Sequence, residues 1–263
     1  MNDLIQVILL GIIEGITEFL PISSTGHLLI AEHLGLGARS DVFNVVIQLG
    51  AILAVVAIYR QRLWQLASGW REPANRDYAY KLAAAFVVTG VLGVAVKKAG
   101  LKLPVELGPV ALALLIGGFW MLAAEALAAR RAPATRISWT GAVVAGLAQI
   151  VAAIFPGTSR SAAAIFALML AGTGERAAAT EFVFLLGIPT MFAASAAELH
   201  GALKAGAPAE NWADLGIAFV VSMVVAFVAV KWLLRYIQTH RFTAFAVYRI
   251  VIGATLLFLL PRI

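Results

Sequence analysis

Residues 14–27 have the sequence EGITEFLPISSTGH, which places two carboxylates, a Ser-Ser-Thr cluster and an imidazole inside a strongly apolar region. Ionisable side chains are rare in such surroundings, and where they occur they mark functional sites. The proline within the stretch also interrupts any long helix. This stretch therefore predicts two short helices joined by a polar break, rather than one continuous apolar helix.

A second segment repeats this pattern. Residues 146–161, GLAQIVAAIFPGTSRS, match residues 11–26, GIIEGITEFLPISSTG, at a constant offset. The match places Gln149 on Glu14, Pro156 on Pro21, Thr158 on Ser23 and Ser159 on Ser24. We therefore expect a duplicated chain with one polar break in each half.

The composition indicates an all-α polytopic membrane protein. Of the 263 residues, 62% are hydrophobic and 13% charged, which leaves too little polar surface for a soluble domain. Six segments are apolar and long enough to cross a bilayer, namely 41–59, 79–96, 107–129, 178–198, 213–235 and 243–260. Regions 3–35 and 138–172 are interrupted by proline, glycine and hydroxyl residues, so we expect two re-entrant helical hairpins there.

The order of these segments predicts an inverted-topology repeat within a single membrane domain, 1–263, made of repeat one, 1–130, and repeat two, 138–263. Three spans separate the hairpins, and an odd number of crossings turns the second repeat upside down relative to the first. The hairpin tips should then meet near the middle of the membrane.

Charged residues in the loops indicate the orientation and the partner. Lys and Arg accumulate on the cytoplasmic side, and placing the 60–77 loop there puts eleven of them inside and five outside. Met1 and the 199–212 loop then lie outside. The net charge of +6 sits in short loops between apolar runs, so we expect the lipid bilayer, and no nucleic acid, as its partner. The chain has no cysteine, which excludes a disulfide and a Cys nucleophile.

Glu14 and Glu18 form an acidic pair, since a spacing of four residues places both on one helix face. Two like charges in an apolar setting repel each other and lose hydration. Stable ionisation of the pair therefore requires a divalent cation, a basic partner, or a proton kept on one carboxyl.

The second break predicts an anion site at a helix start. Backbone N–H groups near Gly157, with the hydroxyls of Thr158, Ser159 and Ser161, would surround an anion, and Arg160 would add a planar fork suited to phosphate oxygens. The alternative is ordinary helix capping with an arginine that extends to the membrane interface.

The first break has a similar helix start at Ser23, Ser24 and Thr25. Ser24 and His27 lie three residues apart on one helix face, close enough for the imidazole to exchange a proton with a hydroxyl or a phosphate. The alternative is a packed, hydrogen-bonded histidine without a chemical role.

The two motifs, Glu-Gly-x-x-Glu-x-x-Pro-x-Ser-Ser-x-Gly-His and Pro-Gly-Thr-Ser-Arg-Ser, resemble those of the membrane-integral undecaprenyl-diphosphate phosphatase family, also known for bacitracin resistance. The resemblance covers essentially the whole chain. It implies hydrolysis of undecaprenyl diphosphate to the monophosphate carrier for cell-wall synthesis, with a divalent cation, Mg²⁺ or Ca²⁺. It also implies a bacterial inner-membrane protein whose active site opens to the periplasm.

Carried over by residue, the resemblance implies Glu14 and Glu18 as the acidic pair that binds the metal, and Arg160 with Ser159 as phosphate binders. Ser24 and His27 become candidates for the nucleophile or for acid/base catalysis. One departure is that Ala162-Ala163-Ala164 follows Ser161, so the hydroxyl contact that the family pattern predicts at Ala164 is absent.

The predicted catalytic set is thus Glu14, Glu18, Ser24, His27 and Arg160, and the predicted substrate-binding set is Ser23, Thr25, Gly157, Thr158, Ser159 and Ser161. The sequence does not choose between Ser24, His27 and an activated water as nucleophile, nor between a monomer and a homodimer. A prenyl-phosphate lipid flippase or an anion transporter would also explain broken helices with an anion site. A scaffolding membrane protein would leave the acidic, histidine and arginine side chains unexplained.

Overall fold

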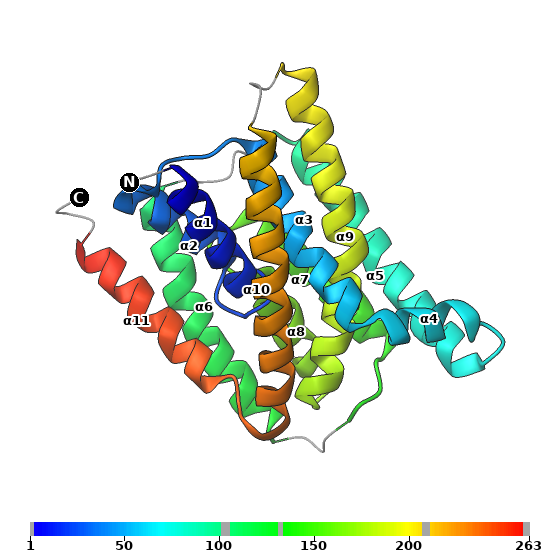
Figure 1. Ribbon diagram of the computed structural model, residues 1–263. Coiled ribbons are helices and arrows are strands. Elements are labelled where there is room, and N and C mark those ends of the chain that lie inside the picture. The colour runs from blue at the N-terminus through cyan, green and yellow to red at the C-terminus, as the bar shows by residue number, and fades with distance from the viewer. Residues whose placement is uncertain (1–2, 101–105, 131–133, 207–210, 260–263) are drawn as a thin grey trace.

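The computed structural model describes residues 3–100, 106–130, 134–206 and 211–259. The described residues form helices and no strands. Their bounds are α1 Asp3–Thr17, α2 Ser24–Ala31, the π-helix η1 Glu32–Leu36, α3 Asp41–Ile58, α4 Arg60–Ser68, α5 Pro73–Lys98, α6 Leu107–Ala128, α7 Trp139–Ile154, α8 Arg160–Leu170, α9 Arg176–Lys204, α10 Trp212–Thr239 and α11 Thr243–Leu259. Figure 1 shows α10 crossing the centre of the molecule, with α11 and α4 at opposite ends.

Both predicted polar breaks are present. α1 ends at Thr17 and α2 begins at Ser24, while α7 ends at Ile154 and α8 begins at Arg160. Each pair of short helices is thus joined by a turn that contains the proline of its motif.

Five helices among the described residues, α3, α5, α6, α9 and α10, are long and apolar enough to cross a membrane. The sixth expected span, 243–260, corresponds to α11, which has 17 described residues and belongs with the shorter apolar helices. Large apolar side chains such as Val91, Trp120 and Trp232 remain exposed on the outer faces, as expected for a surface in contact with lipid.

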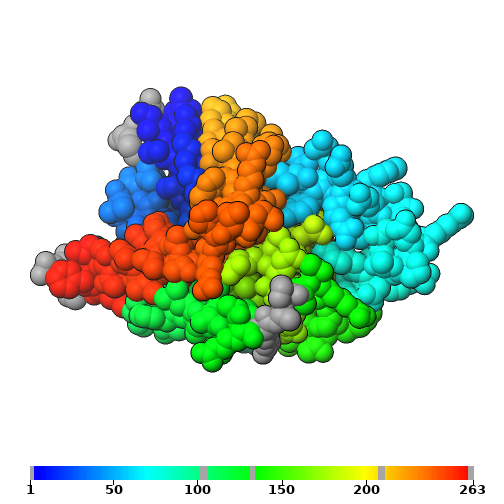
Figure 2. Space-filling model, turned by 90° about the horizontal axis from the view of Figure 1, so that it is seen from below, coloured from blue at the N-terminus to red at the C-terminus, as the bar shows by residue number. Residues whose placement is uncertain are grey.

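The two halves use corresponding packing partners. α1 packs against α10, and α7 packs against α5, while α6 packs against α11 and α3 against α9. Seen from below, α11 and α4 again lie at opposite ends, with α10 between them (Figure 2). The short broken helices are therefore each supported by a long helix from the other half.

Close approach of α7 to α5 depends on Gly146. A Cβ atom at Gly146 would lie 2.7 Å from the carbonyl oxygen of Ala85, which is backbone and has little room to move. The hydroxyl of Thr89 in α5 also donates to the carbonyl oxygen of Gly146 at 3.1 Å. Small residues at such crossings let two helix backbones pack closely in a membrane protein.

Two further contacts fix the ends of helices near the centre. Phe19, in the turn after α1, meets Phe184 of α9 edge to face with ring centroids 5.2 Å apart. Buried Glu125 of α6 pairs with Arg176 at 2.5 Å and accepts the backbone N–H of Phe242 at 3.2 Å. This carboxylate therefore connects α6, the start of α9 and the residue before α11.

We predict that Gly146→Ala lowers the thermal unfolding midpoint of the detergent-purified protein, because overpacking a helix contact costs about 1–3 kcal/mol. Gly90→Ala, in α5, is the matched control, since a Cβ atom at that position would meet open space. There the gain in helix propensity, up to about 1 kcal/mol, should leave the midpoint unchanged or raised. Equal midpoints for the two variants would contradict the close packing of α7 on α5.

Candidate functional site

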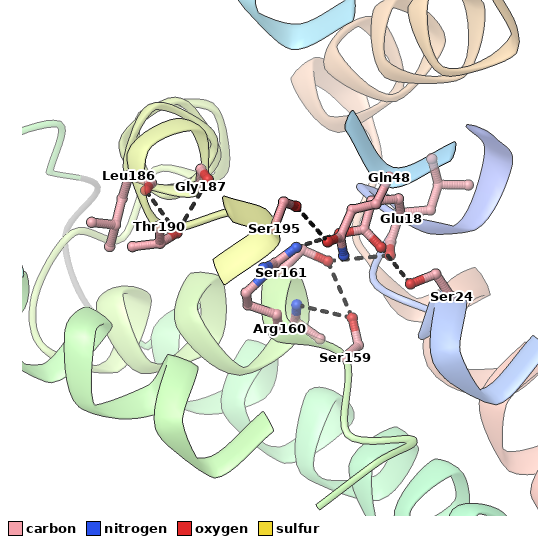
Figure 3. Close-up of polar contacts among 12 residues, drawn as sticks. Glu18, Ser24, Gln48, Ser159, Arg160, Ser161, Leu186, Gly187, Thr190 and Ser195 are labelled. Carbon is pink, nitrogen blue, oxygen red and sulfur yellow. Dashed lines mark hydrogen bonds and ion pairs between the residues drawn. The ribbon is translucent and has the colours of Figure 1, made fainter. Parts of the chain in front are cut away.

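The two helix breaks meet in the interior of the protein. The Ser161 hydroxyl, at the start of α8, donates to the carbonyl oxygen of Leu20 in the first break at 3.2 Å. Arg160 forms an ion pair with Glu18 across the same contact. Residues more than 140 positions apart in the sequence thus form one site, as Figure 3 shows.

Both breaks end in a serine with an unusual backbone conformation. Ser23 has φ 76° and Ser159 has φ 68°, and these are the described non-glycine residues with positive φ. Each caps its helix, because the Ser23 hydroxyl accepts the N–H of Gly26 and the Ser159 hydroxyl accepts that of Ala162, both at 3.3 Å. Strained conformations of this kind cluster at functional sites.

The equivalence of these two caps corrects the sequence alignment by one residue. The constant offset placed Ser159 on Ser24, whereas the backbone places Ser159 on Ser23 and therefore Arg160 on Ser24. The first break, 18–23, is one residue longer than the second, 155–159, so a match without a gap loses register within the turn.

Glu18 is the centre of the polar contacts. Its Oε1 accepts from Arg160 Nη2, and its Oε2 accepts from the Ser24 hydroxyl. The Glu18 side chain is 4% exposed and that of Arg160 is 28% exposed, so the arginine is the more accessible member of the pair. A serine hydroxyl hydrogen-bonded to a buried carboxylate is the arrangement of a nucleophile beside its general base.

A cavity of about 410 Å³ opens beside these residues. Of the predicted site residues, Glu14, Glu18, Ser23, Ser24, Thr25, Gly157, Ser159 and Arg160 line it. Glu14 is 2% exposed, and its Oε2 has no hydrogen-bond partner. Gly157 has φ 95°, and a Cβ atom there would lie 2.7 Å from the carbonyl oxygen of Val110, so this turn requires glycine.

Three predicted residues lie outside the cavity lining. Ser161 contacts the Ser159 hydroxyl at 3.1 Å as well as Leu20. Thr158 faces an apolar groove between α6 and α7. His27 contacts the carbonyl oxygen of Ser23 through Nδ1 and the Tyr248 hydroxyl through Nε2, each at 2.7 Å.

The imidazole of His27 therefore faces α11 rather than the cavity. Its ring stacks on Tyr248 with centroids 5.6 Å apart and an interplanar angle of 5°. The structure brings Ser24, and not His27, into contact with Glu18.

Arg249 is a residue of the site that the sequence reasoning missed. Its side chain is fully buried in α11, and its guanidinium donates to the carbonyl oxygens of Thr158 at 2.8 Å, Gly157 at 2.9 Å and Pro21 at 3.4 Å. A further bond reaches Ala113 of α6 at 3.1 Å. No ion pair joins it to an acidic side chain among the described residues.

Arg249 thus connects both breaks through backbone carbonyls that have lost their helical partners. Space for the guanidinium comes from Gly117 in α6, where a Cβ atom would lie 2.0 Å from Arg249 Nη2. The sequence did contain a signal for Arg249, because it is an arginine within the apolar run 243–260. Charged residues at membrane depth require internal partners.

Comparisons with known proteins match this chain over nearly its full length. The model of the bacitracin resistance protein BacA family matches residues 7–255. A protein of Rhizobium leguminosarum bv. trifolii named undecaprenyl-diphosphatase is 65% identical over 257 residues, which is 97% of this chain and 96% of the relative. A protein of the same name from Xanthomonas axonopodis pv. citri is 59% identical over 262 residues, or 99% of this chain and 98% of the relative.

We predict that Arg249→Met lowers the free energy of unfolding by at least about 2 kcal/mol, because it leaves several buried carbonyl groups unpaired. Gly117→Ala should act in the same direction, since its methyl group occupies the space of the guanidinium. The control is Arg235→Met, which changes an exposed arginine of α10. Thermal unfolding in detergent measures all three, and a wild-type midpoint for Arg249→Met would show that water or other donors satisfy the breaks.

Proposed function

The chain belongs to the bacitracin resistance protein BacA family, and on this premise we propose that it hydrolyses undecaprenyl diphosphate to undecaprenyl phosphate and inorganic phosphate. This reaction regenerates the lipid carrier for cell-wall synthesis. The observation that best supports the proposal is the Ser24–Glu18–Arg160 chain of contacts, which joins a nucleophile, a base and a phosphate-binding group at one cavity.

The proposed chemistry begins with binding of the diphosphate in this cavity. The free donors of Arg160 bind phosphate oxygens, since a guanidinium offers several N–H groups in one plane. The strained turn at Gly157 and Ser159 presents backbone and hydroxyl groups to the same anion. Positioning and neutralisation of charge provide most of the catalysis in phosphoryl transfer.

We propose Ser24 as the nucleophile. As its oxygen attacks the terminal phosphorus, its proton passes to Glu18, and the bond between that phosphorus and the bridging oxygen breaks. Undecaprenyl phosphate leaves, and water then hydrolyses the phosphoserine to release inorganic phosphate, with the proton returning to Ser24. His27 and a directly attacking water are the alternatives. The contact of His27 with Tyr248, outside the cavity lining, favours Ser24 over His27.

A divalent cation, Mg²⁺ or Ca²⁺, belongs to the proposal. The buried, unpartnered Oε2 of Glu14 suits a cation, because hard carboxylate oxygens are the ligands that both metals prefer. Glu18, the other acid of the predicted pair, already has both oxygens in contacts with Arg160 and Ser24. When bound, the cation would neutralise negative charge on the diphosphate oxygens.

We further infer that the protein crosses the bacterial inner membrane six times, through α3, α5, α6, α9, α10 and α11, with two re-entrant hairpins, α1–α2 and α7–α8. The matched packing of α1 on α10 and α7 on α5, together with the equivalent serine caps, supports an inverted repeat. The loop charges support an active site that opens to the periplasm.

A flippase or anion transporter of the same architecture would move substrate without breaking a bond. Phosphate release from undecaprenyl diphosphate by the purified protein in detergent, where no gradient exists, separates the two functions. We expect release, and its absence in a folded protein would overturn the proposed hydrolysis.

We predict that Ser24→Ala lowers kcat by about a thousandfold or more, since it removes the nucleophile. His27→Ala should cost much less, because the imidazole lies outside the cavity and contacts Tyr248. Ser68→Ala, at the exposed end of α4, is the control and should match the wild type. Steady-state phosphate release measures all three variants. The reverse order, with His27→Ala inactive and Ser24→Ala active, would assign the chemistry to His27.

Topology gives a separate prediction, and the absence of native cysteine makes it simple to test. A cysteine at Ala74, at the start of α5, should be protected from a membrane-impermeant maleimide added outside intact cells. One at Ala209, a position outside the described residues, should react. Both should react once the membrane is permeabilised. Labelling of both positions in intact cells would contradict the proposed orientation.

A further inference from the structure

Gln149 of α7 has a buried amide without a partner. The residue is 3% exposed, and neither its Oε1 nor its Nε2 has a hydrogen-bond partner. It lines the 410 Å³ cavity together with Glu14, Glu18 and Arg160. Nearly all buried polar side chains are hydrogen-bonded, so an amide with both groups unpaired beside a polar cavity is a candidate to bind a ligand in that cavity.

Two other polar side chains of the cavity, Gln48 and Glu18, do have partners. Gln48, a second amide that lines the cavity, accepts a hydrogen bond from Ser195 at 3.2 Å (Figure 3). Glu18 uses both of its carboxylate oxygens. Within the cavity lining, the buried side-chain atoms without a partner are Glu14 Oε2 and the two polar atoms of Gln149.

These unpaired atoms come from corresponding helices of the two halves. Glu14 lies in α1 and Gln149 in α7, at positions that the repeat alignment places on each other. Both side chains therefore approach the cavity from opposite halves of the protein. A carboxylate oxygen and an amide oxygen are hard ligands suited to Mg²⁺ or Ca²⁺.

We propose that Gln149 Oε1 and Glu14 Oε2 together bind the divalent cation, and that Gln149 Nε2 donates to an oxygen of the diphosphate. This inference rests on the proposed function for the identity of the anion. Mg²⁺ is typically held by one or two protein oxygens plus substrate phosphates and water, so two protein ligands are sufficient. The roles of the acids then differ, because Glu14 binds metal while Glu18 holds Ser24 and Arg160.

The test is direct Mn²⁺ binding to detergent-purified protein, followed by electron paramagnetic resonance with and without methylenediphosphonate, a diphosphate mimic that cannot be hydrolysed. We expect Gln149→Met to weaken Mn²⁺ binding by about tenfold or more, at least the effect of losing an outer-shell partner of a metal site. Gln149→Glu supplies a carboxylate instead, so it should retain or strengthen Mn²⁺ binding while weakening binding of the diphosphonate by charge repulsion.

The matched control is Thr180→Val. The Thr180 hydroxyl in α9 is also buried without a partner, but it does not line the cavity. This variant should bind Mn²⁺ like the wild type. Thermal unfolding without metal adds a second readout, since replacing an unpaired amide by an apolar side chain of similar size should leave the midpoint of Gln149→Met unchanged or raised.

Wild-type Mn²⁺ affinity in Gln149→Met would overturn the inference, as would the absence of Mn²⁺ binding by the wild type both with and without the diphosphonate. If Gln149→Met fails to fold, Gln149→Glu decides, because weakened Mn²⁺ binding there contradicts a ligand role. Failure of the proposed hydrolysis is distinguishable, since it would appear as no phosphate release by the wild type while the Mn²⁺ differences persist.

Discussion

Helices that stop inside an apolar protein leave carbonyl groups that lipid cannot satisfy, and this constraint shapes the whole site. Arg249 meets it by donating to Pro21 in one break and to Gly157 and Thr158 in the other. One side chain thereby sets the separation of the two turns. The charge of Arg249 faces carbonyl dipoles, whereas Glu18 is paired with Arg160 and Ser24.

Each half of the protein supplies what the other lacks. The α1–α2 segment contributes Glu14, Glu18 and Ser24, whereas the α7–α8 segment contributes Arg160 and the strained turn at Gly157 and Ser159. Glu18 and Arg160 balance each other's charge in a region where either one alone would be costly to bury. The ion pair is therefore a structural contact between the halves and a part of the proposed chemistry.

The sequence was sufficient to locate both breaks, because proline and polar residues contrast sharply with the apolar background. It also predicted that Glu14, Glu18, Ser24 and Arg160 lie in one site, and all four line the same cavity. The sequence left open whether a divalent cation, a basic partner or a retained proton stabilises the acidic pair, and the structure shows a basic partner, Arg160, at Glu18. The contacts of His27 were not predictable, since they depend on Tyr248, 221 residues away. Arg249 was missed for a similar reason, because its partners are backbone atoms and carry no signature in side-chain type.

The distance in sequence between Glu18 and Arg160 has a consequence for biosynthesis. The two partners are 142 residues apart, and at about 5–20 residues per second the ribosome needs on the order of ten seconds to make the intervening chain. During that interval the first hairpin exists without its guanidinium partner. A bare carboxylate at membrane depth is expensive. Until the second half arrives, newly made α1 and α2 therefore need another way to avoid a bare buried carboxylate, either a proton on Glu18 or a position near water or within the insertion machinery.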